Sequence, residues 1–162
     1  MILFDIKLLV IALAALVLLF LLARYRYKVA IPLTAALLIA THWSYYFRYE
    51  YNGSNIFLLD RINIYPLILW TVGLTTLHLA SYKLPRKHRL VLGSVSYLVF
   101  LMIAEAVGYY LLDIRLQSNY TSLLGLGVIH APVTMKAFYV FAGPAYLVLL
   151  ELLSKKLPII EL

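Results

Sequence analysis

The chain of 162 residues contains no cysteine and few charges, since only 13% of its residues are charged while 64% are hydrophobic. Without cysteine there can be no disulfide, no thiolate metal site and no thiol catalysis. An ordinary soluble domain has about a quarter charged residues, so the scarcity of charge excludes that class of fold. The sequence also lacks a P-loop, a nucleophile elbow and a dinucleotide-binding fingerprint. The composition is instead typical of an integral membrane protein.

The charges that are present have an uneven sign, with 14 Lys and Arg against 7 Asp and Glu. A basic soluble protein would suggest a nucleic-acid partner. Here the cations lie at the ends of apolar runs, which is the pattern of membrane topology. We therefore expect the lipid bilayer and its anionic headgroups as partners, and no nucleic acid.

Five apolar runs predict an all-α transmembrane helical bundle, a single domain over residues 1–162. A helix needs about 20 residues to cross the hydrocarbon core. The expected spans are residues 6–23, 29–47, 62–82, 90–112 and 132–153. Between the last two, residues 116–131 are expected to form an outer loop whose second half, 123–130, dips against the bundle.

The distribution of the cations predicts the orientation. If the N-terminus is outside, one side of the membrane receives nine of the 14 cations: Arg24, Arg26, Lys28, Lys83, Arg86, Lys87, Arg89, Lys155 and Lys156. The positive-inside rule makes this side cytoplasmic, so the C-terminus is cytoplasmic as well. We expect a multi-pass protein of a cell or plasma membrane.

The second apolar run ends in aromatic residues: His42, Trp43, Tyr45, Tyr46, Tyr49 and Tyr51. Trp and Tyr gather at membrane interfaces because the ring tolerates lipid while the polar tip meets water. An interfacial belt is the first interpretation of this run. A stacking site for a ring-shaped ligand is the alternative.

Glu105 is the one carboxylate inside the run 90–112, and an ionisable group at such a depth is a candidate functional group. Lys136 is the only cation expected within a span, so it is the default partner for an ion pair with Glu105. At about 1.5 Å rise per residue, His42 is expected at a similar depth. The functional interpretation is a polar pocket open to the outer face, with Glu105, Lys136 and His42 catalytic and Tyr109, His130 and Tyr139 binding the ligand. The structural interpretation is a buried ion pair with interfacial neighbours.

The four histidines, His42, His78, His88 and His130, show no paired metal-ligand spacing, so no metal site is expected. His42 and His130 are the only pair that could bind a haem between helices. No cofactor follows from the sequence.

The layout of the first half of the chain resembles that of the lycopene cyclase domain family. The shared features are an N-out helix, a basic turn, a helix ending in aromatics, and Pro66-Leu67 at the start of the next helix. The family carries Pro-Leu-Glu-Glu at this point, whereas this chain has Pro66-Leu67-Ile68-Leu69. Because both carboxylates are absent, the resemblance implies no activity for this protein.

Two classes of function remain. The first is a non-catalytic subunit or scaffold of a larger membrane complex, or a self-associating protein. Small residues could let other helices approach closely: Gly93, Ser94, Ser96, Gly143 and Ala145. The alternative is a membrane enzyme or binding protein for a lipophilic substrate, such as a lipid, a quinone or an isoprenoid, with Glu105 as acid or base. A transporter is less favoured because no inverted repeat is present.

Overall fold

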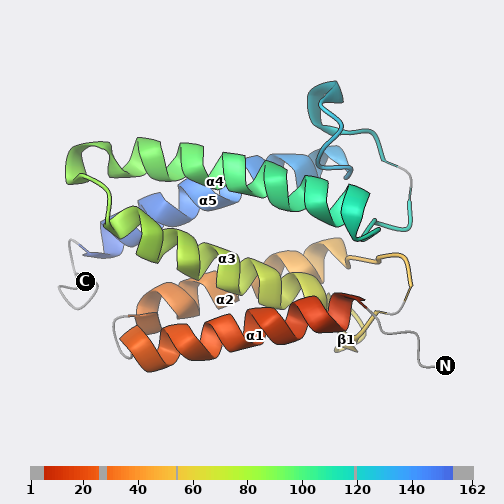
Figure 1. Ribbon diagram of the computed structural model, residues 1–162, viewed down its shortest axis with the longest axis horizontal. Coiled ribbons are helices and arrows are strands. Elements are labelled where there is room, and N and C mark those ends of the chain that lie inside the picture. Colours follow the sequence, from red (N-terminus) through yellow and green to blue (C-terminus); the bar gives the residue numbers. More distant parts are fainter. Residues whose placement is uncertain (1–5, 26–28, 54, 119, 155–162) are drawn as a thin grey trace.

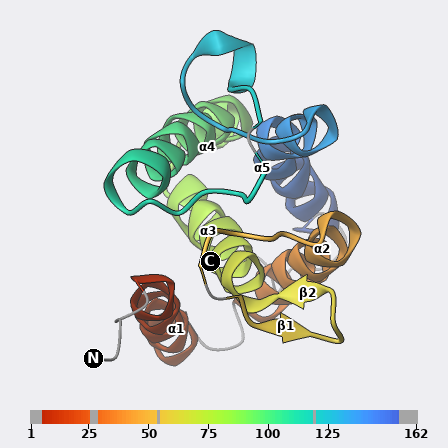
Figure 2. The ribbon, with the colours of Figure 1, turned by 90° about the vertical axis from the view of Figure 1, so that its right-hand side faces the viewer.

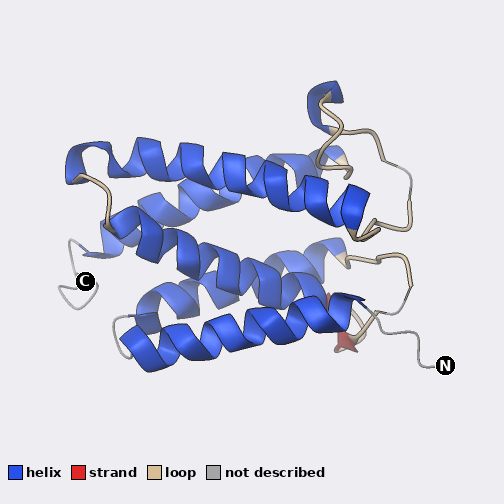
Figure 3. Ribbon diagram, viewed as in Figure 1, coloured by secondary structure: helices blue, strands red, loops and turns tan. Residues whose placement is uncertain are grey.

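A computed structural model describes residues 6–25, 29–53, 55–118 and 120–154 as an all-α bundle (Figures 1 and 3). Its helices are α1 (Ile6–Tyr25), α2 (Ala30–Phe47), α3 (Ile64–Tyr82), α4 (Arg89–Ala106) and α5 (Val133–Ser154). A π-helical turn over Val107–Leu111 extends α4. When the π-helical turn is counted as part of α4, each helix begins and ends within two residues of the run predicted for it. The predicted fold class is confirmed.

Four helical segments are long and apolar enough to cross a membrane: Ile6–Tyr25, Ile64–Tyr82, Arg86–Leu111 and Val133–Ser154. The remaining predicted span, residues 29–47, corresponds to α2. The second half of α2 carries His42, Ser44 and aromatic side chains in place of a continuous aliphatic run, and its mean hydropathy does not reach that of the four segments above. The four apolar segments indicate a membrane-embedded protein.

The central helix of the bundle is α3, which contacts each of the four other helices (Figure 2). Pro66 lies in its first turn, where a missing N–H breaks no helical hydrogen bond, and Asn63 caps it by accepting a hydrogen bond from the Tyr65 N–H at 3.0 Å. α1 packs mainly against α3, and α4 pairs with α5. Most residues of α1 and α4 are therefore not covered by the chain itself.

Two glycines let α4 approach its neighbours closely. A Cβ at Gly143 of α5 would overlap the ring of Tyr97, and one at Gly93 of α4 would lie 2.7 Å from Ser81 Oγ and 2.9 Å from Leu147 Cδ1. The sequence suggested these glycines as contact surfaces for other proteins, and for both positions that expectation is wrong. Their close contacts are made within the chain, because α4 needs them to pack on α3 and α5.

The two ends of the bundle differ (Figure 1). At one end, segments 48–63 and 112–132 fold over the helices, and the first carries the hairpin β1 (Phe57–Leu58) and β2 (Ile62–Asn63). We call this the loop-covered end. At the other, α1, α3 and α5 end and α4 begins after a 3-10 turn over Arg86–His88. We call this the basic end because it gathers Arg24, Lys83, Arg86, Lys87 and Arg89.

Candidate functional site

The tyrosines near the end of α2 fall into two groups. Tyr45 and Tyr46 are 48% and 63% exposed, as residues of an interfacial belt would be. Tyr49 and Tyr51 are only 1% and 8% exposed, so the belt interpretation is wrong for them. α2 ends at Phe47, and the left-handed backbone of the next residue, Arg48 (φ 43°), turns the chain back over the bundle. Residues two apart in the extended segment that follows point to the same side, and this side faces the core.

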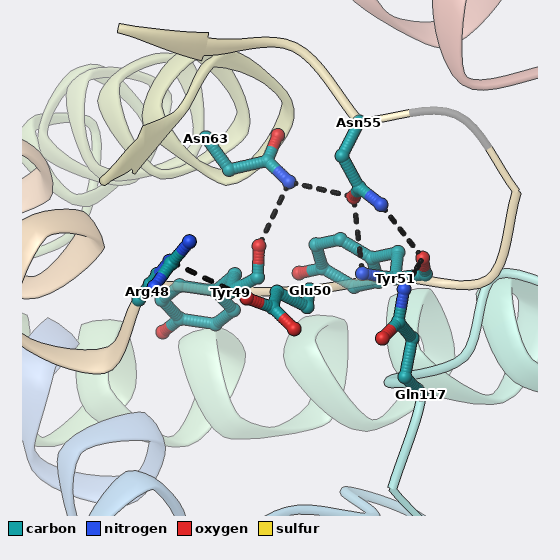
Figure 4. A network of polar contacts seen from close by, with 7 residues as sticks. All are labelled: Arg48, Tyr49, Glu50, Tyr51, Asn55, Asn63 and Gln117. Carbon is teal, nitrogen blue, oxygen red and sulfur yellow. Dashed lines mark hydrogen bonds and ion pairs between the residues drawn. The ribbon is translucent and has the colours of Figure 1, made fainter. Parts of the chain in front are cut away.

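Two asparagines hold this segment in place (Figure 4). The Asn63 amide donates to the Tyr49 carbonyl and to Asn55 Oδ1, both at 2.9 Å. The Asn55 amide donates to the Tyr51 carbonyl at 2.8 Å, and Asn55 Oδ1 accepts from the Tyr51 N–H at 3.0 Å. These contacts fix the backbone of both tyrosines and so determine where their phenols lie.

The second loop closes over the first. The Asn52 N–H donates to the Arg115 carbonyl at 2.8 Å, and the Gln117 N–H donates to the Glu50 carbonyl at 2.9 Å. Tyr51 and Leu116 form an isolated antiparallel bridge between these two contacts. The segments that follow α2 and α4 therefore form one cap over the bundle.

Below this cap, five buried or half-buried tyrosines lie within electrostatic range of Glu105. Burial raises the pKa of Tyr49 and Tyr51, and the charge of Glu105 adds to this effect. Glu105 also lies close enough to act electrostatically on Tyr65 of α3, Tyr97 of α4 and Tyr139 of α5. We call these residues the phenol cluster: Tyr49, Tyr51, Tyr65, Tyr97 and Tyr139.

The polar atoms of this cluster are only partly satisfied. The Tyr97 hydroxyl donates to the Tyr139 carbonyl. The Tyr49 hydroxyl is buried and has no hydrogen-bond partner among the described residues, although Tyr139 and Trp70 lie near it. Glu105 is half-buried, and the described residues form neither a hydrogen bond nor an ion pair with it.

The ion pair predicted between Glu105 and Lys136 does not form. Lys136 Nζ donates instead to Thr121 Oγ1 at 3.0 Å and to the Ser122 carbonyl at 3.2 Å. Lys136 lies in the first turn of α5, next to the preceding loop, whereas Glu105 lies more than a turn inside the end of its helix. The loop therefore supplies the hydrogen-bond acceptors of the Lys136 ammonium group, and the Glu105 carboxylate does not.

Tyr109 and His130 do come together, at the loop-covered end. Their rings stack with centroids 3.9 Å apart. The Arg115 guanidinium lies 4.5 Å from the Tyr109 ring centre and forms an ion pair with Asp113, with Nε 2.8 Å from Oδ1. Burial lowers the pKa of His130, and the cations of Lys136 and Arg115 lower it further. Stacking makes this pair a structural joint between the end of α4 and the loop before α5.

His42 lies apart from these groups. Its side chain is exposed on α2, and its ring meets the edge of Trp43 at 5.6 Å. The structure thus divides the predicted site. Glu105 and Tyr139 share the phenol cluster, Tyr109 and His130 stack above it, Lys136 binds the loop, and His42 faces outward. In the described ranges no three His, Cys, Asp or Glu side chains gather as metal ligands.

Sequence reasoning missed Tyr49, Tyr51, Tyr65 and Tyr97 as neighbours of Glu105. One signal was present in α4, where the buried residues Gly93, Tyr97 and Leu101 are spaced four apart and Glu105 is the next residue in that series. Side chains at i and i+4 share a helix face, so the pattern places Glu105 on the buried face. The inward turn of Tyr49 and Tyr51 depends on the cap and has no such local signal.

No protein-family model, no curated protein and no solved structure matches this chain. The resemblance to lycopene cyclase domains therefore gains no support.

Proposed function

We propose that the protein binds a lipophilic molecule whose polar group meets Glu105 within the phenol cluster. The observation that carries this proposal is a half-buried carboxyl group to which the described residues offer no partner. A carboxylate taken out of water without compensation costs several kcal/mol, and ionisable groups within membrane helices mark functional sites by default. A ligand group or water therefore supplies the missing contact.

The chemistry of the cluster narrows the class of ligand. Tyrosine rings offer apolar contact surface, and the Tyr49 hydroxyl, which has no partner among the described residues, offers a donor. Glu105 accepts a hydrogen bond when ionised and can donate one when protonated. An apolar body with a hydroxyl or carbonyl group suits this set, which fits a lipid, a quinone or an isoprenoid.

The test is to identify what copurifies. The protein is purified in mild detergent, extracted with organic solvent, and the extract is analysed by mass spectrometry against an empty-membrane control. We expect one lipophilic species at near-stoichiometric amount, strongly reduced in Glu105→Gln and Tyr49→Phe. Glu50→Gln is the matched control, because Glu50 lies at the same end but pairs with Arg48 at 3.3 Å on the surface. Equal recovery from the wild type and Glu105→Gln would contradict the proposal.

A second candidate is a subunit of a larger membrane assembly. It is favoured by the broad faces of α1 and α4 that the described chain leaves uncovered. On α4, Ser96 is an exposed small residue among apolar ones, which would let another helix approach closely. Mass measurement of the protein in mild detergent distinguishes the candidates. A lone monomer that keeps its ligand would count against the subunit, whereas a stable complex without ligand would count against the binding protein.

The sequence also supports an orientation of the protein. Nine of the 14 cations lie, along the sequence, at or next to the helix ends of the basic end, against five elsewhere. The positive-inside rule then makes the basic end cytoplasmic. A reporter fused after Leu162 should be active only in the cytoplasm and one inserted after Gly53 only outside. The reverse result at both positions would overturn the orientation.

A further inference from the structure

A cavity of about 210 Å³ opens at the basic end, between the end of α3, the start of α4 and the end of α5. This volume is well over ten times the ~15 Å³ that a single water needs. Polar and charged side chains line much of it: His78, Ser81, Tyr82, Arg86, Arg89 and Glu151. The cavity lies at the other end of the bundle from Glu105 and is independent of the phenol cluster.

Three buried polar atoms at this cavity lack a partner in the described part of the chain. They are His78 Nε2, Ser81 Oγ and Arg89 Nε. The side chains of His78 and Ser81 are only 6% and 2% exposed. Buried polar groups are nearly always hydrogen-bonded, so three such atoms on one cavity indicate a ligand with several acceptor oxygens.

Neighbouring groups hold these donors in position. The Arg89 guanidinium lies 4.3 Å from the Tyr82 ring centre, and its Nη2 donates to the Tyr82 carbonyl at 3.4 Å, which leaves Nε free. Gly93 leaves space for the Ser81 hydroxyl, since a Cβ there would lie 2.7 Å from Oγ. The site is therefore preformed on three packed helices.

We propose that this cavity binds the phosphodiester of a phospholipid headgroup. Arginine matches phosphate oxygens in charge and geometry, Ser81 supplies a further donor, and His78 supplies one in the tautomer that carries its proton on Nε2. The source is a lipid and not free phosphate, because the cavity lies where three apolar helices end and Leu90, Leu147 and Leu150 line it beside the polar groups. The acyl chains would continue along the exposed apolar face of α4.

Glu151 defines the headgroup further. Its carboxylate lines the cavity, and the described residues form no ion pair with it. A purely anionic headgroup would meet repulsion there, whereas a headgroup with a primary ammonium group would pair with it. The site therefore prefers an ethanolamine-type headgroup, with phosphate on the arginine side and ammonium on Glu151.

The test uses the full chain purified in detergent and short-chain phospholipids of one tail length. Thermal unfolding is followed while ethanolamine, choline or glycerol phospholipid, or inorganic phosphate, is titrated in. We expect a saturable rise in the unfolding midpoint, with highest affinity for the ethanolamine lipid. An equal rise with inorganic phosphate would overturn the lipid assignment, and equal affinities for all three lipids would overturn the role of Glu151.

Variants connect the effect to the cavity, each compared with its own lipid-free midpoint. Arg89→Met and Ser81→Ala should weaken lipid affinity by roughly tenfold or more, because a hydrogen bond to a charged group is lost. Ser81→Ala removes only a hydroxyl, so it tests the site even where Arg89→Met unfolds the protein. Lys87→Met is the matched control, since Lys87 is exposed in the same turn and does not line the cavity. A loss in Lys87→Met equal to that in Arg89→Met would show nonspecific attraction and overturn the site. Glu151→Gln should remove the preference for ethanolamine over glycerol.

Discussion

The two ends of the bundle treat polar groups in opposite ways. At the loop-covered end, Asn55 and Asn63 use their amides to satisfy the backbone of Tyr49 and Tyr51. At the basic end, His78, Ser81 and Arg89 keep buried polar atoms without a partner around a cavity. Side-chain amides thus satisfy buried backbone groups at the loop-covered end, whereas no described residue satisfies these three side-chain atoms at the basic end.

The loop-covered end also contains exceptions of its own. Beside the hydrogen-bonded backbone of the cap, the buried Tyr49 hydroxyl and His130 Nδ1 have no partner among the described residues, and these residues offer Glu105 neither a hydrogen bond nor an ion pair. A closed network beside unsatisfied groups is the arrangement expected when a rigid scaffold positions a site. The variants below test whether the cap provides stability while the unsatisfied groups provide binding.

The largest effect is expected from Asn63→Ala. Asn63 is 1% exposed, donates to the Tyr49 carbonyl and to Asn55, and caps α3 through the Tyr65 N–H. Its loss leaves buried backbone groups unpaired and should destabilise the protein by about 3 kcal/mol, measured by chemical unfolding in detergent. Asn52→Ala, whose exposed side chain belongs to the same cap, should cost less than about 0.5 kcal/mol. Similar losses in both variants would show that the cap does not depend on Asn63.

The next effect compares glycines near the two sites. Gly143→Ala should cost about 1–3 kcal/mol, because the new methyl group overlaps the buried ring of Tyr97, which hydrogen bonding to Tyr139 holds in place. Gly93→Ala should cost less, since the new Cβ meets the ends of the Ser81 and Leu147 side chains, which shift more easily than a buried ring. Gly73→Ala meets nothing within 4 Å and should stabilise α3 by about 0.5–1 kcal/mol. Thermal unfolding of the three variants gives the order, and a larger loss in Gly93→Ala than in Gly143→Ala would reverse the comparison.

An effect similar in size to that of Gly143→Ala concerns Lys136, which the structure assigns to the loop and not to Glu105. Lys136→Met should cost about 1–3 kcal/mol through its hydrogen bonds to Thr121 and Ser122. In double-mutant cycles, Lys136→Met should couple to Thr121→Val by about 1 kcal/mol and be additive with Glu105→Gln within about 0.5 kcal/mol. Rescue of Lys136→Met by Glu105→Gln would instead show that the two groups meet.

The fold was predictable from the sequence, because an apolar run of about 20 residues with charged ends has few structures open to it other than a membrane helix. The importance of Glu105 was predictable for the same reason, since a charge in such a run is rare. Its neighbours were not. Tyr49 and Tyr51 turn inward only because a left-handed Arg48 and two asparagines from a later segment direct the chain. Lys136 binds Thr121 and Ser122 because the loop before α5 folds back onto it. The sequence prediction used only the depth of Lys136 along its helix, and that depth says nothing about where an irregular loop lies.

The smallest expected effect is the pH dependence that His130 contributes. Burial lowers the pKa of His130 in the folded protein, with Lys136 and Arg115 adding to the shift, whereas in the unfolded chain the pKa is about 6.5. At low pH the unfolded chain therefore binds more protons, so this contribution is complete above about pH 6.5 and is lost as the pH falls below it. The unfolding midpoint should fall between pH 7.5 and 5.5, less steeply in His130→Gln and to an intermediate extent in Arg115→Met. Because the wild type and His130→Gln share every other titratable group, the difference between their slopes reports on His130. If His130→Gln keeps the full slope, the stacked pair of Tyr109 and His130 contributes to packing alone.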